Sequence, residues 1–432
     1  MTAGVKCLIL LAFIAIFFVT ELIPLAVTAM GGAIACGLLG LLPAKAVFAG
    51  LSNSTVVLFA GMFVVGGAMF HTGLAQKVGA GVVKLSGTSE NSLMIGIMLI
   101  GAVLSALLSN TGTCACLLPV VLGISKASGI PASRQLMPLA FACGVGGTMT
   151  MIGTPPNILA NGALEAAGLA ELQFGFFEYA LIGFPLTIVG ILYMVFIGKH
   201  LLPTEDLNSD TEVASDEVDV DEANFTVSKQ IISGAILLSV VFVMAAGKSL
   251  GLPITLPMAA IIGALLAVVT GCLNERQAYA SIDWVTIFLF AGMMPVSVAM
   301  DTSGAGKMIA DYTVGLMGGN PSPYLITGVL FILSCGLTQF MSNTASAALL
   351  CPIGIAISQS MGASPKAVLM AIAMAASCAF ASPVGTPPNT LVLGPGGYKF
   401  MDYVKCGTGL IVVSFVVCLI LIPIIWPFFP AQ

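Results

Sequence analysis

Ser109-Asn110-Thr111 and Gly153-Thr154-Pro155-Pro156-Asn157 are the two motifs that decide the fold, because the chain contains each of them twice. The second copies, Ser342-Asn343-Thr344 and Gly385-Thr386-Pro387-Pro388-Asn389, follow at offsets of 233 and 232. Both motifs place small polar residues or prolines inside strongly apolar sequence. The chain is therefore predicted to consist of one structural unit that occurs twice.

The composition excludes a soluble globular protein. Of the 432 residues, 58% are hydrophobic and 8% are charged, whereas about a quarter of the residues in a soluble domain are charged. The apolar runs are rich in Leu, Ala, Met and Gly, are longer than a buried strand, and lack the strict alternation of a membrane barrel strand. We therefore predict an all-α polytopic membrane protein.

An acidic linker is predicted between two halves of similar length. Phe59-Ala60-Gly61-Met62 matches Phe290-Ala291-Gly292-Met293 at an offset of 231, so the register extends upstream of the two motifs. Between the halves, residues 205–222 hold nine of the nineteen acidic residues, and such a segment without apolar periodicity stays solvated. We expect a first repeat at residues 1–202, an acidic cytoplasmic linker at 203–227 and a second repeat at 228–432.

Each half is predicted to contain about five membrane spans, one of them interrupted. In the first half the predicted spans are residues 5–20, 25–42, 55–70, 135–168 (interrupted) and 176–197. In the second half they are residues 231–246, 256–270, 285–300, an interrupted span that starts at residue 366, and residues 407–428. An amphipathic segment at residues 74–85 is expected at the membrane interface.

Two short apolar arms flank each Ser-Asn-Thr motif, at residues 93–108 and 113–124 in the first half. They form either a re-entrant hairpin or two complete helices. Each half has an odd number of spans in both cases, because the arms add either none or two. An odd number inserts the second half in the opposite orientation, which is the inverted repeat of secondary transporters.

The positively charged residues predict the orientation of the chain. Five of them fall on the side of the N-terminus: Lys6, Lys45, Lys248, Lys307 and Lys366. Nine fall on the other side: Lys77, Lys84, Lys126, Arg134, Lys199, Lys229, Arg276, Lys399 and Lys405. Cytoplasmic loops carry the excess of Lys and Arg. We therefore expect the second side to be cytoplasmic and both termini to be extracytoplasmic.

The proline pair of the second motif predicts a helix that breaks near the middle of the membrane. Proline lacks an N–H group and clashes with the preceding turn. In a bilayer the backbone groups freed by the break need protein, water or an ion as partners. Freed carbonyls suit a cation, and the N–H groups of the next half-helix suit an anion. The residues expected to border the anion at the two breaks are Thr154, Pro155, Thr386 and Pro387.

Each Ser-Asn-Thr motif offers two hydroxyl groups and an amide at the same depth as the break. A single such motif is most often a helix cap, and a single proline pair is most often a turn or kink. Duplication at matched spacing favours one central site built from two hairpin tips and two breaks. No Lys or Arg lies in the arms or beside the proline pairs. An anion would therefore need hydroxyls, dipoles and a co-bound sodium ion.

The sequence offers no group that indicates a transition metal, an organic cofactor, a nucleic-acid partner or an enzyme. Cys114 and Cys116 have no His or carboxylate near them in sequence, so the eleven cysteines are interpreted as small hydrophobic residues. The two histidines, His71 and His200, lie at span ends away from the motifs. An intramembrane hydrolase would therefore lack a base for its nucleophile.

At these motifs the sequence resembles the divalent anion:sodium symporter family, within the wider ion-transporter superfamily. The resemblance covers essentially the whole chain. It is carried by both Ser-Asn-Thr motifs, by Gly147-Thr148-Met149-Thr150-Met151-Ile152 leading into the first proline motif, and by Pro383-Val384 leading into the second. Gly394-Pro395-Gly396-Gly397-Tyr398 is similar to bacterial members.

The resemblance implies a homodimer in which a mobile transport domain moves past a static scaffold in an elevator motion. It also implies the residues of the sites, on the positions that match. The anion would be contacted by Asn110, Thr111, Asn343 and Thr344. One sodium site would be formed by Ser105, Ser109, Asn110 and the backbone at Gly153, and the other by Thr338, Asn343 and the backbone at Gly385.

The sequence therefore predicts a sodium-coupled symporter of small divalent anions, such as C4-dicarboxylates or sulfate, in a bacterial plasma (inner) membrane. The expected partners are the anion, sodium ions, membrane lipid and a second copy of the chain. A sodium-independent dicarboxylate exchanger is the nearest alternative. An anion channel is a more distant one, because broken helices and hairpins also build selectivity filters.

Overall fold

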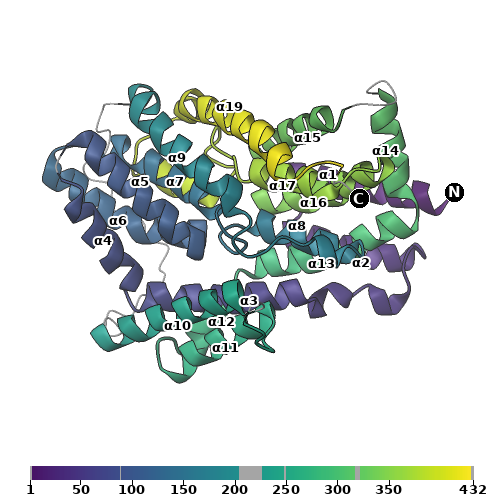
Figure 1. Cartoon of the computed structure of the whole chain (residues 1–432), viewed down its shortest axis with the longest axis horizontal. Coiled ribbons are helices and arrows are strands. Elements are labelled where there is room, and N and C mark those ends of the chain that lie inside the picture. Colours follow the sequence, from purple (N-terminus) through teal and green to yellow (C-terminus); the bar gives the residue numbers. More distant parts are fainter. Residues whose placement is uncertain (1, 88, 204–225, 248–249, 317–321, 430–432) are drawn as a thin grey trace.

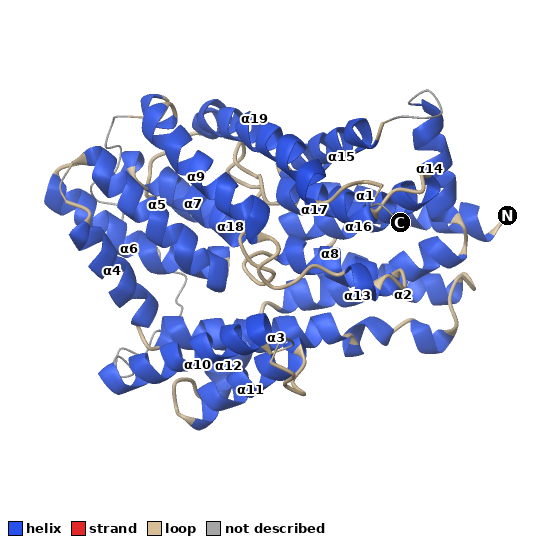
Figure 2. Ribbon diagram, viewed as in Figure 1, coloured by secondary structure: helices blue, strands red, loops and turns tan. Residues whose placement is uncertain are grey.

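The structure is a computed structural model that describes residues 2–87, 89–203, 226–247, 250–316 and 322–429. Within these ranges every regular element is a helix, as Figure 2 shows, which confirms the all-α class. Most of the predicted acidic linker lies outside the described residues. The boundaries of the two repeats stay predictions.

Nine α-helices are described in the first half. They are α1 (Ala3–Thr20), α2 (Leu25–Leu38), α3 (Ser54–His71), α4 (Leu74–Leu85), α5 (Glu90–Leu107), α6 (Asn110–Ser128), α7 (Leu136–Gly147), α8 (Pro155–Ala166) and α9 (Ala180–Phe196). The helix at α4 coincides with the predicted amphipathic segment. The hairpin arms are longer than predicted, because α5 and α6 extend into the polar sequence on either side.

The described helices of the second half follow in the same order. They are α10 (Val227–Ala246), α11 (Leu256–Val269), α12 (Glu275–Ala280), α13 (Trp284–Thr302), α14 (Ala305–Leu316), α15 (Pro323–Thr338), α16 (Asn343–Ser360), α17 (Pro365–Ala376), α18 (Pro387–Leu393) and α19 (Phe400–Ile425). Two of them, α12 and α14, were not predicted. At the position of α12 the first half has two short 3₁₀ helices, Ala44–Ala46 and Ala49–Ser52.

The apolar helices are long enough for a polytopic membrane protein. In the described part of the chain, eight helices of at least 18 residues are apolar enough to cross a membrane, and four shorter apolar helices accompany them. Many of their large hydrophobic side chains are exposed, such as Phe13, Leu238 and Val269. In a bilayer these side chains would meet lipid or a partner subunit.

One group of helices interlocks the two halves through glycine contacts. α13 packs along α2, and α11 packs along α3 (Figure 1). α10 and α12 lie beside α3 and α11. A Cβ atom on Gly61 of α3 would lie 2.8 Å from the backbone of Ala260 in α11. A Cβ atom on Gly292 of α13 would lie 2.5 Å from the backbone of Ala29 in α2. The two contacts use equivalent positions of the two halves, because both pairs share the offset of 231.

A second group contains the hairpins and the broken helices. α5 packs on α7, and α15 packs on α17. The second pieces of the broken helices cross between the halves, because α8 packs on α16 and α17 while α18 packs on α6 and α7. The motifs of the two halves are therefore brought together by the packing of the second group.

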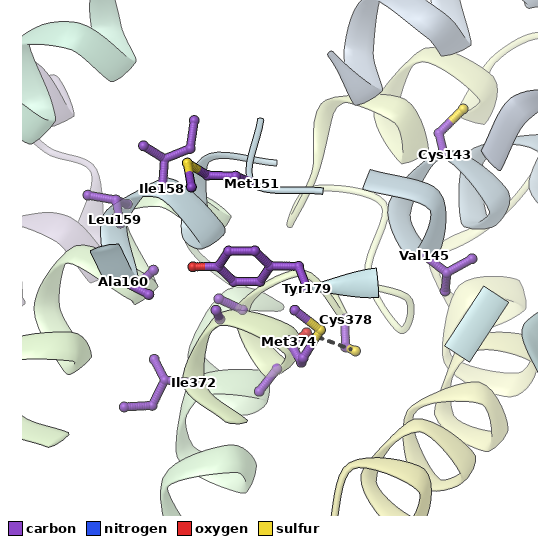
Figure 3. Close-up of a cluster of buried hydrophobic side chains, with 14 of the residues drawn as sticks. Cys143, Val145, Met151, Ile158, Leu159, Ala160, Tyr179, Ile372, Met374 and Cys378 are labelled. Carbon is purple, nitrogen blue, oxygen red and sulfur yellow. Dashed lines mark hydrogen bonds between the residues drawn. The ribbon is translucent and has the colours of Figure 1, made fainter. Parts of the chain in front are cut away.

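A buried tyrosine holds each of the two helices, α8 and α18, that pack on the other half of the chain. Figure 3 shows Tyr179 among side chains of α8 and α17, and its hydroxyl donates to the carbonyl of Asn157 at 2.5 Å. In the second half the hydroxyl of Tyr403 donates to the carbonyl of Asn389 at 2.7 Å. Both acceptors are the last residues of the Gly-Thr-Pro-Pro-Asn motifs. The first turn of α8 is therefore held by Tyr179, and that of α18 by Tyr403. Both tyrosines lie outside the Gly-Thr-Pro-Pro-Asn loops.

Candidate functional site

Each Ser-Asn-Thr motif lies at the tip of a helical hairpin, as predicted. Ser109 is the N-cap of α6, and its Oγ accepts a hydrogen bond from the Gly112 N–H at 3.1 Å. Ser342 is the N-cap of α16, and its Oγ accepts from the Ala345 N–H at 3.2 Å. The serines thus begin the second helix of each hairpin. The asparagines that follow are its first helical residues.

The predicted helix breaks are confirmed at both proline motifs. α7 ends at Gly147 and α8 begins at Pro155, whereas α17 ends at Ala376 and α18 begins at Pro387. The prolines occupy the first helical positions, where a missing N–H group leaves no bond unmade. The two loops share one hydrogen bond of the motif asparagine: Nδ2 of Asn157 donates to Thr150 O, and Nδ2 of Asn389 donates to Ser382 O, each at 2.8 Å.

A cluster of oxygen atoms surrounds the amide of Asn110. Ser105 Oγ donates to Asn110 Oδ1 at 2.5 Å and to the carbonyl of Cys143 at 2.8 Å. When the amide is turned the other way, its nitrogen lies 3.0 Å from the carbonyl oxygen of Gly153 and 3.1 Å from that of Cys143, and donates to both. One end of the Asn110 amide is therefore enclosed by three oxygen atoms.

The second half repeats this cluster around Asn343. Thr338 Oγ1 donates to Asn343 Oδ1 at 2.6 Å and to the carbonyl of Ala376 at 2.8 Å. With the amide turned, its nitrogen donates to Ala376 O at 3.0 Å and to Gly385 O at 3.2 Å. Each of these residues stands at an offset of 232 or 233 from its counterpart in the first cluster.

Both clusters have the donor set of a small hard cation. With the amide oxygen turned inward, each cluster gathers an amide oxygen, a hydroxyl and two backbone carbonyls, which are the oxygen ligands that such cations prefer. Glycines leave the space for this arrangement, since a Cβ atom on Gly147 would lie 2.2 Å from Asn110 Oδ1. In the described part of the chain no group of three or more His, Cys, Asp or Glu side chains could hold a metal ion.

A cavity of about 920 Å³ joins the motifs of both halves. Its predicted members are Ser109, Asn110, Thr111, Gly153, Thr154, Pro155, Asn343, Thr344, Thr386 and Pro387. Ser105 and Thr338 are fully buried behind this surface, where they contact the asparagines. The Ser109 hydroxyl and carbonyl accept the N–H groups of Gly112 and Thr113, so both of its oxygens already have a partner.

Two kinds of functional residue could not be predicted from the sequence. The carbonyls of Cys143 and Ala376 complete the oxygen clusters. The two positions are 233 residues apart, but a Cys and an Ala do not match in type, so the sequence contains no signal for these backbone ligands. The other wall of the cavity was also missed, because its elements carry neither the Ser-Asn-Thr motif nor the Gly-Thr-Pro-Pro-Asn motif. That wall includes Phe59, Phe63, Phe70, His71, Arg276, Asp283 and Leu289.

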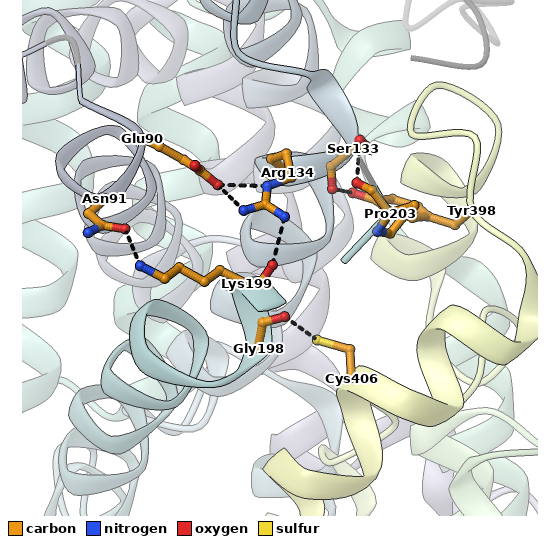
Figure 4. A network of polar contacts seen from close by, with 9 residues as sticks. All are labelled: Glu90, Asn91, Ser133, Arg134, Gly198, Lys199, Pro203, Tyr398 and Cys406. Carbon is orange, nitrogen blue, oxygen red and sulfur yellow. Dashed lines mark hydrogen bonds and ion pairs between the residues drawn. The ribbon is translucent and has the colours of Figure 1, made fainter. Parts of the chain in front are cut away.

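Ion pairs hold the outer ends of the two broken helices. Figure 4 shows Arg134, just before α7, donating to Glu90 Oε1 at 2.7 Å and to the carbonyl of Lys199 at 2.8 Å. The hydroxyl of Tyr398 accepts the Met137 N–H at 2.8 Å. Tyr398 ends the glycine-rich segment that was singled out in the sequence, so this segment anchors the start of α7.

The start of α17 is held by an equivalent network. Lys366 Nζ lies 2.7 Å from Glu178 Oε1, which also accepts the Trp426 indole N–H at 2.6 Å. Burial raises the pKa of Glu178, but hydrogen bonds from Lys366, the Gly175 N–H and Trp426 outweigh it and hold the pKa below its ordinary value. Arg134 and Lys366 share the offset of 232, so each broken helix starts at a charged anchor.

Comparison with known proteins agrees with this architecture. A model of the citrate transporter (CitMHS) family matches residues 15–350 and 240–431. The chain belongs to the citrate transporter family. This member is a transporter rather than an enzyme, and an integral membrane protein. The resemblance to the divalent anion:sodium symporter family is thereby confirmed.

Three relatives of this citrate transporter family member come from bacteria. It is 28% identical to the uncharacterized transporter YfbS of Escherichia coli, over 97% of this chain and 98% of that one. It is 32% identical to an uncharacterized transporter of Haemophilus influenzae, over 93% of this chain and 87% of that one. It is 27% identical to the sodium-dependent dicarboxylate transporter SdcS of Staphylococcus aureus, over 98% of this chain and 86% of that one.

The fold is also similar to solved transporter structures. The YdaH transporter of Alcanivorax borkumensis aligns with a TM-score of 0.64 at 16% identity, over 98% of both chains. MtrF of Neisseria gonorrhoeae, named as an antimetabolite efflux pump, aligns with a TM-score of 0.58 at 14% identity, over 87% of this chain and 82% of that one. At these identities the likeness concerns the fold alone.

Proposed function

We propose that this protein is a sodium-coupled symporter of small divalent anions, such as C4-dicarboxylates or sulfate. The observation that carries the proposal is the cavity in which both Ser-Asn-Thr motifs meet both helix breaks, with an oxygen cluster behind each asparagine. The sodium-dependent dicarboxylate transporter SdcS, similar over nearly the whole chain, supports the same substrate class. Asn110, Thr111, Asn343 and Thr344 would contact the anion, and Thr154, Pro155, Thr386 and Pro387 would border it.

Coupling would follow from the two orientations of each asparagine amide. A sodium ion in the cluster attracts the amide oxygen, so the amide nitrogen turns to the cavity and donates to the anion. Without sodium, the nitrogen donates to the carbonyls of the cluster and the oxygen turns to the cavity, where it repels the anion. Cation and anion binding would then be linked reciprocally at Asn110 and Asn343.

Alternating access would use the two groups of helices as two bodies. In an elevator motion, the group with the hairpins and broken helices would move past the interlocked group of α2, α3, α10, α11, α12 and α13. The cavity is bordered by Leu25 at the start of α2, His71 at the end of α3 and Asp283 just before α13. With both termini extracytoplasmic, all three positions are cytoplasmic helix ends. The proposed conformation is therefore inward-facing. The proposed assembly is a homodimer, and the proposed location is the bacterial plasma (inner) membrane.

Uptake into proteoliposomes tests the proposal. We expect purified protein to accumulate labelled succinate or sulfate when an inward sodium gradient is imposed. No sodium-dependent uptake of any dicarboxylate, tricarboxylate or oxyanion would contradict it. Counterflow against preloaded dicarboxylate without sodium would assign the exchanger instead, and unitary currents in electrical recordings would assign the channel.

A further inference from the structure

Arg276 places a positive charge on the wall of the cavity. It belongs to α12 and is the one Lys or Arg among the described residues that line the cavity. Its side chain is exposed. Neither of the two ion pairs in the described part of the chain involves Arg276, since they join Arg134 to Glu90 and Lys366 to Glu178. The guanidinium is therefore available to an anion in the cavity.

The nearest acidic group of the lining is already engaged. Asp283 is the one Asp or Glu among the described lining residues. Its Oδ1 accepts the Thr286 N–H at 3.1 Å, and its Oδ2 accepts the Thr286 hydroxyl at 2.5 Å. The carboxylate thus caps the start of α13. It does not form an ion pair with Arg276.

The position of Arg276 is fixed by the contacts of α12. Asn274 and Gln277 form a capping box around it, with hydrogen bonds of 2.8 and 2.9 Å. Ser281, which follows α12, donates to the carbonyl of Gln277 at 2.8 Å and packs on Gly67 of α3, where a Cβ atom would lie 2.2 Å from the serine Oγ. The backbone of Arg276 is therefore held in a fixed position beside the cavity.

The first half carries a positive charge at the equivalent position. Lys45 precedes Arg276 by the offset of 231 that also relates Phe59-Ala60-Gly61-Met62 to its second copy. Five residues before each charge, Gly40 and Gly271 both adopt a left-handed conformation, with φ of 70° and 71°. Lys45 is exposed in the 3₁₀ helix Ala44–Ala46, and it is not among the lining residues of the cavity.

We propose that Arg276 and Lys45 are a matched pair of anion-attracting charges, one for each face of the membrane. The inference rests on the proposed symport of divalent anions between two inverted halves. Arg276 attracts the anion to the cavity when it opens on one face, and Lys45 does so when it opens on the other. A cation at the mouth of a cleft raises the local anion concentration and the association rate, and salt screens this effect.

Sided transport assays test the pair. Intact cells present one face of the protein and everted membrane vesicles present the other, so the KM for succinate is measured in both at low and high ionic strength. Arg276→Gln is expected to raise KM about three- to tenfold in one preparation at low ionic strength, and Lys45→Gln in the other. The maximal rate should stay near that of the wild type. The increase should shrink as salt is added.

Charge-conserving and remote variants serve as controls. Arg276→Lys and Lys45→Arg are expected to keep the wild-type KM. Lys405→Gln removes the charge of an exposed lysine on α19, outside the described cavity lining. This variant is expected to keep the wild-type KM in both preparations. If Arg276→Gln does not yield folded protein, Arg276→Lys decides, because a structural role for the guanidinium would make the lysine variant equally defective at every salt concentration.

Failure of the pair is distinguishable from failure of the proposed function. Wild-type protein without sodium-dependent uptake contradicts the function itself. Wild-type uptake with an unchanged KM for both glutamine variants overturns the inference alone. Two charges that act on the same face, or KM increases that salt does not reduce, also overturn it.

Discussion

Asn110 and Asn343 are the residues at which cation and anion binding meet in the proposed mechanism. Asn110→Asp and Asn343→Asp separate the two functions, because aspartate keeps an oxygen for the cluster but has no N–H to donate, and its charge repels a divalent anion. We expect each variant to be stabilised thermally by sodium but not by succinate, and transport to fall at least about tenfold.

Alanine at the same positions removes both functions. Asn110→Ala and Asn343→Ala are expected to fold but to lose the stabilisation by sodium and by succinate, since a ligand that binds the native state raises its stability. Asn91→Ala is a suitable control, because its side chain binds Lys199 away from the cavity. An aspartate variant that binds succinate but not sodium would contradict the amide mechanism.

Gly153 and Gly385 are required for the close approach of the loops to the hairpins. A Cβ atom on Gly153 would lie 2.4 Å from the carbonyl oxygen of Gly147, and one on Gly385 would lie 2.3 Å from that of Thr338. Because both obstacles are backbone atoms, alanine must displace the loop and its coordinating carbonyl. We expect Gly153→Ala and Gly385→Ala each to lower sodium-dependent uptake at least about tenfold.

The control for this prediction lies in the same half of the chain. Gly315 lies inside α14, has open space around its Cβ position and does not have a left-handed φ. Gly315→Ala is expected to transport at the wild-type rate. Normal uptake by Gly153→Ala would show that the first oxygen cluster is not needed.

At the residue scale, the sequence allowed the side-chain ligands to be predicted but not the backbone ligands. Asn110 and Asn343 stand out because their residue type and spacing are repeated. Cys143 and Ala376 contribute carbonyl oxygens, and the side chain attached to a carbonyl says nothing about this role. Arg276 was placed on a cytoplasmic loop by counting charges, but its approach to the cavity depends on how α12 packs on α3.

At the scale of elements, the glycine contacts between the two halves decide the stability of the interlocked group. Gly61→Leu and Gly292→Leu each force a side chain against the backbone of a neighbouring helix, and overpacking of this kind costs about 1 to 3 kcal/mol. We expect the midpoint of thermal denaturation in detergent to fall by several degrees in each variant. Gly31→Leu should be close to the wild type, because Gly31 of α2 has open space around its Cβ position.

The anchor at Glu178 predicts a pH-dependent contribution to stability. Its pKa is lowered in the folded protein, so the folded state favours the ionised form. The stabilisation is therefore present above the unfolded pKa, near 4.5, and is lost as the pH falls through the lower folded pKa. Glu178→Gln should lower the denaturation midpoint by about 2 to 4 °C at pH 7, with a smaller difference at pH 4. An equal loss at both pH values, or the same loss in Glu171→Gln, would contradict the prediction.

Elements were predictable where hydrophobicity or proline marks them and not where tertiary contacts do. The long apolar helices and both breaks follow from the sequence, because each depends on local composition. α12 has six residues, and its helix is stabilised by the Asn274–Gln277 capping box and by packing on α3. α14 is the counterpart of α4 in the second half and is also amphipathic, with Lys307 and Asp311 on it. The amphipathic pattern predicted α4, whereas α14 was not predicted.

At the scale of the whole molecule, the matching order of helices is visible, but the orientation of the halves in a membrane is still a prediction. Inversion requires that equivalent positions of the two halves lie on opposite faces. Ala44 and Glu275 are such positions, since they share the offset of 231 and are both exposed. The cysteines are all buried in the structure, so a single cysteine introduced at either position provides a selective label.

Labelling from each face tests the inversion and the orientation together. With a membrane-impermeant maleimide, we expect Ala44→Cys to react in intact cells and Glu275→Cys to react in everted vesicles, because the positive residues place the second position in the cytoplasm. Wild-type protein controls for the native thiols. The opposite assignment would reverse the orientation and keep the inversion, whereas reaction of both cysteines from the same face would contradict the inverted repeat on which alternating access between the two halves depends.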